Sequence, residues 1–387
     1  MSVIDGKRLL LLSLRCALTE EAPPKELSAL SEEDFAGLFA LAKHFDVAPM
    51  VAYALKRAGD FPQGETAERL RRAQTAAVFR TERQLYEKER IGAALERAGI
   101  EHIFLKGTAV RPLYREPWLR TGADIDILVR KADHERACRL LRETLSCTRA
   151  KETAHDSALR FPDGTVAELH FSLTEQHPAW ENALRELWET VLPAEGRTYE
   201  KRLSPEYLYV YFFIHTAKHF ERGGIGLRPM TDLYLMRRHW ADDREQEGRM
   251  LAAAGLEKFA AALEKLTEHW FASGEADELT RRTERYVFEG GIYGGMQNRV
   301  KVGQTVRGGK WRYALYRAFM PYEELIALYP SLRGRKGLLP LYWVRRWGYH
   351  LFGGTLSGVR REWRQSRTVP QEEAEQTKNY LKELGLL

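Results

Sequence analysis

Cysteine is scarce in this chain, and the spacings typical of a disulfide framework or a thiolate zinc site are missing. The 387 residues include three cysteines, Cys16, Cys138 and Cys147, an odd number without a CxxC pair. This usage argues against a disulfide-rich secreted scaffold and against a cysteine zinc module. A reducing cytoplasm fits it best, and we expect the protein to be cytoplasmic.

Long apolar runs are missing as well. The most hydrophobic stretches, LYVYFFI and LLPLYWV, fall well short of the roughly 20 residues that a membrane helix needs. The N-terminal GKRLLLLSLRCALTEEAPP begins like a signal peptide, but Arg15 interrupts its apolar run and acidic residues follow at once. We therefore predict an amphipathic helix there, and a soluble protein with no membrane span.

Neither charge sign dominates the composition. There are 60 basic and 54 acidic residues, a formal net charge of +6, which permits a nucleic-acid partner without requiring one. We find no internal repeat and no low-complexity tract. The content of 44% apolar and 11% aromatic residues is ample for buried cores. The local motifs must therefore carry the functional interpretation.

The spacing of apolar residues changes along the chain. It is helical at first, where Ser31 is a candidate N-cap and Gly99 ends the pattern. Short extended runs follow, two of them joined by a Pro-Asp-Gly turn, before helical spacing returns. We predict an α+β fold in which a small mixed sheet is flanked by helical modules. The predicted division is an N-terminal helical module (1–99), an α+β core (100–177), a helical module that completes the active-site cleft (178–290) and a basic, aromatic-rich region (291–387).

Two aspartates stand one residue apart in the strand-like segment ADIDILV. Because side chains alternate faces along a strand, Asp124 and Asp126 should share one face while the isoleucines between and after them face a core. Two carboxylates this close repel each other unless a cation lies between them, and hard oxygen ligands suit Mg²⁺ or Mn²⁺. The alternative is a solvated strand edge.

A third carboxylate is available in TVAELHFSL. If Ala167, Leu169 and Phe171 form the apolar face of this strand, then Glu168 and His170 lie on the opposite face. The strand could lie beside the aspartate strand, and Glu168 is our candidate for the third ligand of the site.

A Lys-Gly-Thr turn precedes these strands. Gly107 would let backbone amides approach an anion, and Thr108 would begin a helix whose N-terminus favours phosphate. Lys106 could neutralise phosphate or point to water, and a lone turn of this kind is most often only a turn. Arg120, four residues before Asp124, could pair with a metal-site carboxylate, contact a phosphate, or be a solvated loop cation.

The segments FLKGTAV, ADIDILV and VAELHFSL together resemble the nucleotidyltransferase fold of the polymerase-β superfamily, in particular its uncharacterised bacterial branch of nucleotidyltransferase-like proteins. The resemblance implies that Gly107 and Thr108 hold the triphosphate and that Asp124 and Asp126 bind both metals. It further implies that Glu168 binds one metal and helps to activate the acceptor hydroxyl. The 16 residues between Gly107 and Asp124 exceed the spacing of the compact members, and Thr108 stands where many have serine.

We therefore predict a metal-dependent nucleotidyltransferase, with Mg²⁺ or Mn²⁺ as cofactor and a nucleoside triphosphate as substrate. It would move a nucleoside monophosphate to a hydroxyl acceptor, which could be a small molecule, a protein or an RNA, and release pyrophosphate. A non-catalytic nucleotide- or nucleic-acid-binding module is the alternative. The complete set of three carboxylates favours the enzyme, because a module that only bound phosphate would be better served without them.

Basic residues recur in two later segments. His215, Lys218, His219 and Arg222 share one helix face, which could close over the triphosphate with Lys218 as the leading donor. Alternatively, this face belongs to a helix pair anchored by Asp232. A zinc site lacks the intervening glutamate and an obvious third ligand.

The second basic segment spans residues 299–367, with 15 basic residues, three acids and interleaved aromatics. It suits RNA, an anionic membrane surface or an ordinary cationic surface. We expect the last, so that RNA is a possible partner but not the favoured one.

Overall fold

Helices surround one mixed seven-stranded sheet in the computed structural model. The structure describes residues 5–28, 30–59, 61–153, 155–175, 177–240, 243–290, 296–352, 362–364, 366 and 368–387. The predicted α+β class is confirmed. No helix in these ranges combines the length and the apolar character of a membrane span.

The N-terminal part is helical, as predicted. The amphipathic α1 buries leucines on one face, and Ser31 begins α2 in a capping box with Asp34. Gly99, at a φ of +64°, follows the last turn of the long α4. The helices are α1 (Gly6–Leu18), α2 (Glu32–His44), α3 (Ala48–Ala58) and α4 (Gly64–Arg97).

The sheet has the strand order β3-β4-β5-β2-β1-β7-β6. Its strands are β1 (His102–Phe104), β2 (Asp124–Val129), β3 (Thr148–Glu152), β4 (Asp156–Arg160), β5 (Val166–His170), β6 (Leu192–Pro193) and β7 (Glu200–Arg202). The edge strand β3 was not predicted, because its sequence TRAKE has no apolar alternation and no side chain in it is fully buried. Strands β6 and β7 lie beyond residue 177, so the sheet extends past the predicted core segment.

The two faces of the sheet have different partners. Ile125, Ile127 and Val129 of β2 are buried in a core with residues of α4 and of α6 (His134–Leu145). Leu128 of the same strand faces the other way, into the larger core that includes α8 (Pro205–Phe220). Strand alternation thus sends the aspartates of β2 to the α8 side.

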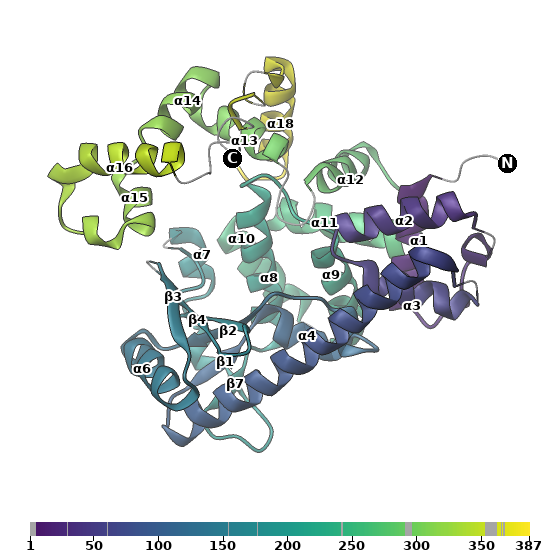
Figure 1. Cartoon of the computed structure of the whole chain (residues 1–387), viewed down its shortest axis with the longest axis horizontal. Helices are drawn as coiled ribbons and strands as arrows, with labels where there is room; N and C mark the ends of the chain where they lie inside the picture. Colours follow the sequence, from purple (N-terminus) through teal and green to yellow (C-terminus); the bar gives the residue numbers. More distant parts are fainter. Residues whose placement is uncertain are drawn as a thin grey trace.

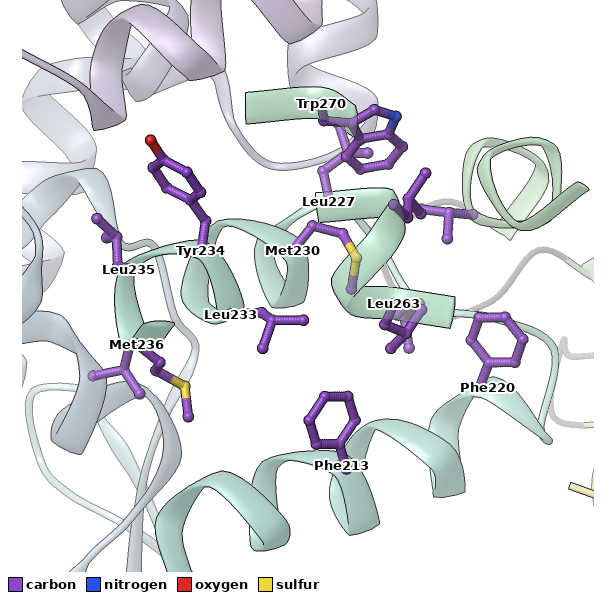
Figure 2. Packing of buried hydrophobic residues seen from close by; sticks show 14 of the residues in the cluster. Phe213, Phe220, Leu227, Met230, Leu233, Tyr234, Leu235, Met236, Leu263 and Trp270 are labelled. Atoms are coloured by element: carbon purple, nitrogen blue, oxygen red, sulfur yellow. The ribbon is translucent and has the colours of Figure 1, made fainter. Parts of the chain in front are cut away.

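A second group of helices builds most of the larger core. Figure 2 shows Phe213 and Phe220 of α8 directed toward Met230 and Leu233 of α9 and Leu263 of α11. The same core contains residues of α1 to α3, so the N-terminal and later helices share one interior. The division of the chain at residues 99, 177 and 290 stays a prediction. These helices are α7 (Pro178–Ala183), α8, α9 (Arg228–His239), α10 (Arg244–Ala254), α11 (Glu257–Phe271) and α12 (Glu278–Gly290).

The C-terminal region is helical, and α14 to α16 lie apart from the sheet (Figure 1). Arg345 lies over the rings of Tyr329 and Tyr342, whereas the neighbouring Arg346 is buried and donates to the carbonyl of Arg317. These adjacent arginines therefore do not form a paired surface charge. Three other arginines of the predicted basic segment, at positions 360, 361 and 367, lie outside the described residues. The helices are α13 (Met296–Arg307), α14 (Lys310–Ala318), α15 (Tyr322–Leu328), α16 (Leu339–Phe352) and α18 (Gln371–Glu383).

Candidate active site

Strands β2 and β5 lie side by side in parallel, with Asp126 opposite Glu168 and Leu128 opposite His170. The neighbouring strands anticipated from the sequence are thus present. Their register brings Glu168 and His170 to the sheet face that carries Asp124 and Asp126.

Three potential metal-ligating groups meet on this face. One atom each of Asp126, Glu168 and His170 lies within 4.8 Å of the others. His170 Nε2 is 2.8 Å from Asp126 Oδ1 and 3.6 Å from Glu168 Oε2. His170 was not among the predicted ligands, although its place two residues after Glu168 puts it on the same strand face. Asp124 is not one of this trio, and the metal-binding role of Asp124, Asp126 and Glu168 stays a prediction.

Lys106 supplies the positive charge closest to these carboxylates. Its Nζ is 2.6 Å from Asp126 Oδ1. Burial alone would raise the pKa of Asp126, but the Lys106 ammonium and a hydrogen bond from His170 hold that pKa well below its usual range. In this structure Lys106 neither points to water nor stands free for phosphate, because it neutralises Asp126.

Asp124 has no comparable bonded partner among the residues that the structure describes. Burial and repulsion from Asp126 raise its pKa to about 6, and Glu168 adds to the repulsion while Lys106 only partly offsets it. Three carboxylates thus crowd around one bonded ammonium. Such a donor set fits a divalent cation, because oxygen ligands with uncompensated charge are what Mg²⁺ and Mn²⁺ prefer, and Mn²⁺ also accepts imidazole.

The Lys-Gly-Thr turn differs from the prediction in one respect. The short helix α5 (Lys106–Val110) begins at Lys106, so Thr108 lies inside the first turn and does not begin it. The backbone of Lys106 has a φ of +45°. A Cβ on Gly107 would lie 2.6 Å from Arg120 Nη1, so a larger residue here would force the Arg120 guanidinium to move.

Arg120 is neither a solvated loop cation nor a partner bonded to Asp124. It binds Asp232 of α9 through two bonds, Nε to Oδ1 at 3.1 Å and Nη2 to Oδ2 at 2.7 Å. The Tyr114 hydroxyl donates to the same Asp232 Oδ1 at 2.7 Å. Asp232 therefore anchors the loop that carries Arg120, and the interpretation in which it anchors the basic face of α8 is wrong.

Lys218 of α8 belongs to a group that we name the Glu175 cluster, consisting of Glu175, His155, Lys218 and Arg222. Lys218 contacts Glu175, Arg222 Nη2 lies 2.6 Å from Glu175 Oε2, and His155 Nε2 lies 3.2 Å from Glu175 Oε1. Glu175 itself has a left-handed backbone, with a φ of +50°. Three cationic or protonatable groups thus converge on one carboxylate.

The Glu175 cluster is connected to the trio through Asp156. His155 Nε2 is 3.1 Å from Asp156 Oδ2, which lies 3.8 Å from His170 Nδ1. The ring centroids of His215 and His219 on α8 are 4.6 Å apart, and neither residue belongs to the trio. Burial, together with the charge of Lys218, lowers the pKa of His219 to about 4, so this ring is neutral at pH 7.

In a comparison with known protein families, one family model matches the chain. The family model described as an uncharacterised nucleotidyltransferase matches residues 31–272. This range includes both strands of the site, the Lys-Gly-Thr turn and helices α8 and α9. No curated protein and no solved structure matches the chain.

Proposed function

Because the chain belongs to the uncharacterised nucleotidyltransferase family, we propose that it transfers a nucleoside monophosphate from a nucleoside triphosphate to an acceptor hydroxyl, with release of pyrophosphate. The observation that carries the proposal is the convergence of Asp124, Asp126, Glu168 and His170 on one face of two parallel strands. A purely binding module would gain nothing from three carboxylates beside a phosphate.

Asp126, Glu168 and His170 are the residues that would hold a divalent cation, with Asp124 beside them. When bound, such a cation would neutralise phosphate oxygens and make a hydroxyl more acidic. Lys106 neutralises Asp126 in this structure. If a cation took over that charge, the Lys106 ammonium, in the first turn of α5, would be available to a phosphate of the nucleotide. Glu168, about one third exposed, is the carboxylate best placed to receive an acceptor.

Glu168→Gln should lower the rate of transfer by about two orders of magnitude or more, the size of effect expected for a group that assists proton removal, while affinity for the Mg²⁺–triphosphate changes little. Glutamine keeps the size of the side chain but is a weak proton acceptor. Single-turnover kinetics and calorimetry separate the two quantities. Glu195→Gln, at an exposed position on a turn, is the matched control. Complete loss of Mg²⁺–triphosphate affinity in a folded Glu168→Gln protein would contradict the acceptor-side role.

Glu175→Gln should tighten the binding of inorganic triphosphate by about tenfold, equivalent to about 1.4 kcal/mol. In the Glu175 cluster the carboxylate occupies Lys218 and Arg222, so a phosphate must displace it, and an amide competes less well for these cations. Titration calorimetry without metal measures the change. If binding were unchanged or weaker, Lys218 would be a structural cation and not a phosphate ligand.

Incubation with each α-labelled nucleoside triphosphate, Mg²⁺ and a cell lysate tests the function as a whole. Label should pass to an acceptor fraction in the presence of the wild-type protein and not in the presence of Asp126→Asn. If no label transfers from any of the four nucleotides, the enzyme proposal fails and the binding-module alternative remains.

A further inference from the structure

A groove lies between α2, the start of α3 and the middle of α4, outside the site described above. Its volume of about 560 Å³ falls in the range of small-molecule pockets, roughly 300 to 1,000 Å³. In Figure 1, α4 runs from the N-terminal helices to the sheet. The groove therefore lies along the same helix that supports the strands of the candidate active site.

The lining of this basic groove is strongly positive. Lys43 comes from α2, and Arg69, Arg72 and Arg80 come from one face of α4, while Asp46 is the only carboxylate among the residues that line it. The floor between the arginines is open because the α4 positions there are alanines. Four basic side chains against one acid give an excess of positive charge that attracts an anion.

Most of this charge is available to a ligand. Arg69 and Arg72 each pair with a glutamate one turn earlier, but their side chains remain 56% and 76% exposed, and surface pairs of this kind are weak. The side chains of Lys43 and Arg80 make no ion pair and no hydrogen bond with any residue that the structure describes. Lys43 and Arg80 are thus the exposed cations of the groove that an anionic ligand can contact without displacing a carboxylate.

The inner end of the groove approaches the candidate active site. Thr121 lines the groove, and its carbonyl accepts from Arg120 Nη1 at 3.1 Å and from Arg228 Nη1 at 2.8 Å. Strand β2 begins three residues later, at Asp124. The nearby Arg111 is buried, and its Nε has no partner within the described residues. The groove therefore reaches the loop that leads into the carboxylate strand. Arg120 on this loop is already paired with Asp232, and Arg228 Nη1 lies 3.8 Å from Asp46 Oδ2.

We propose that the basic groove binds the phosphate groups of the acceptor, so that the molecule receiving the nucleotide is itself phosphorylated. This inference rests on the proposed function and specifies its substrate class. The arginine forks suit phosphate oxygens. Phe39 lines the groove, so one aromatic face for a base or ring lies among the cations.

The test compares two double variants. The groove variant is Lys43→Gln/Arg80→Gln, and the control is Arg71→Gln/Arg97→Gln, which removes the same amount of charge from α4 positions outside the groove. The probes are AMP and a 5′-phosphorylated RNA of about five nucleotides, and affinity is measured by calorimetry at two salt concentrations. We expect the groove variant to lose at least about tenfold in affinity and to show a shallower salt dependence, because phosphate contacts are removed. The control should lose less than about twofold.

The two probes distinguish the source of the phosphate. Comparable affinity for AMP and the oligomer indicates a small phosphorylated acceptor, and binding of the oligomer alone indicates a nucleic-acid end. Three results would overturn the proposal. They are equal affinity of the wild type and the groove variant, equal losses of affinity in both double variants, and no binding of either probe by the wild type. Because binding requires no turnover, this failure is separate from a failure of the transfer assay.

Discussion

Asp124→Asn and Asp126→Asn are both expected to abolish nucleotide transfer, by about three orders of magnitude or more, while changing stability in opposite directions. An amide is a poorer metal ligand than a carboxylate of nearly the same size. The two aspartates differ in their surroundings, however. Asp126 is bonded to Lys106 and His170. Asp124 is repelled by Asp126 and, within the described part of the chain, has no bonded cation.

Without metal, the free energies of unfolding of the two variants should therefore change in opposite directions relative to the wild type. Asp124→Asn removes a carboxylate whose pKa is raised from 3.8 to about 6, so at pH 7 a destabilising charge disappears and the free energy of unfolding should rise by about 1 to 3 kcal/mol. Asp126→Asn leaves the mostly buried Lys106 without its partner. This variant should have a free energy of unfolding about 1 to 3 kcal/mol below that of the wild type. Chemical denaturation in EDTA measures both.

The effect of Mg²⁺ on thermal stability tests whether Asp124 and Asp126 bind a metal ion. Adding Mg²⁺ should raise the melting temperature of the wild type, because a ligand that binds only the folded state stabilises it. In both variants the rise in melting temperature on adding Mg²⁺ should be smaller than in the wild type. Transfer near the wild-type rate by either variant, or an undiminished response to Mg²⁺ in both, would contradict the role of these aspartates.

The strand faces could be predicted from the sequence because alternation is a local property. The DID and ELH segments each place polar side chains two residues apart, and this period alone assigns Asp124, Asp126, Glu168 and His170 to one face of each strand. The Ser31 N-cap and the Gly99 helix end follow from equally local rules. That the two strands could lie side by side was anticipated, but their parallel orientation was not, because alternation sets the face of a side chain and not the direction of the neighbouring strand.

The partners of the basic residues could not be predicted, because they come from distant parts of the chain. Arg120 pairs with Asp232 over 112 residues, and Lys106 with Asp126 over 20. No local pattern encodes such distances. The edge strand β3 was missed for a different reason: its side chains are mainly solvated, so burial imposes no alternation on its sequence.

Asp232→Ala is the second substitution for which we expect a large effect, a loss of about 3 to 5 kcal/mol in the free energy of unfolding. The carboxylate accepts two bonds from Arg120 and one from Tyr114, and its side chain is 5% exposed. Its removal leaves a buried guanidinium uncompensated. That guanidinium packs against Gly107, so the turn beside the carboxylates should loosen as well.

Two control variants separate charge from packing in this prediction. Tyr114→Phe deletes one hydrogen bond to Asp232 and should cost only about 1 kcal/mol. Arg120→Met/Asp232→Leu replaces the whole pair by apolar side chains and should recover most of the stability, because neither charge is then left unpaired. Urea denaturation of the four proteins, wild type included, gives the comparison. A loss of less than about 1 kcal/mol in Asp232→Ala, or a double variant no more stable than it, would show that the buried pair is not what holds the Arg120 loop against the Gly107 turn.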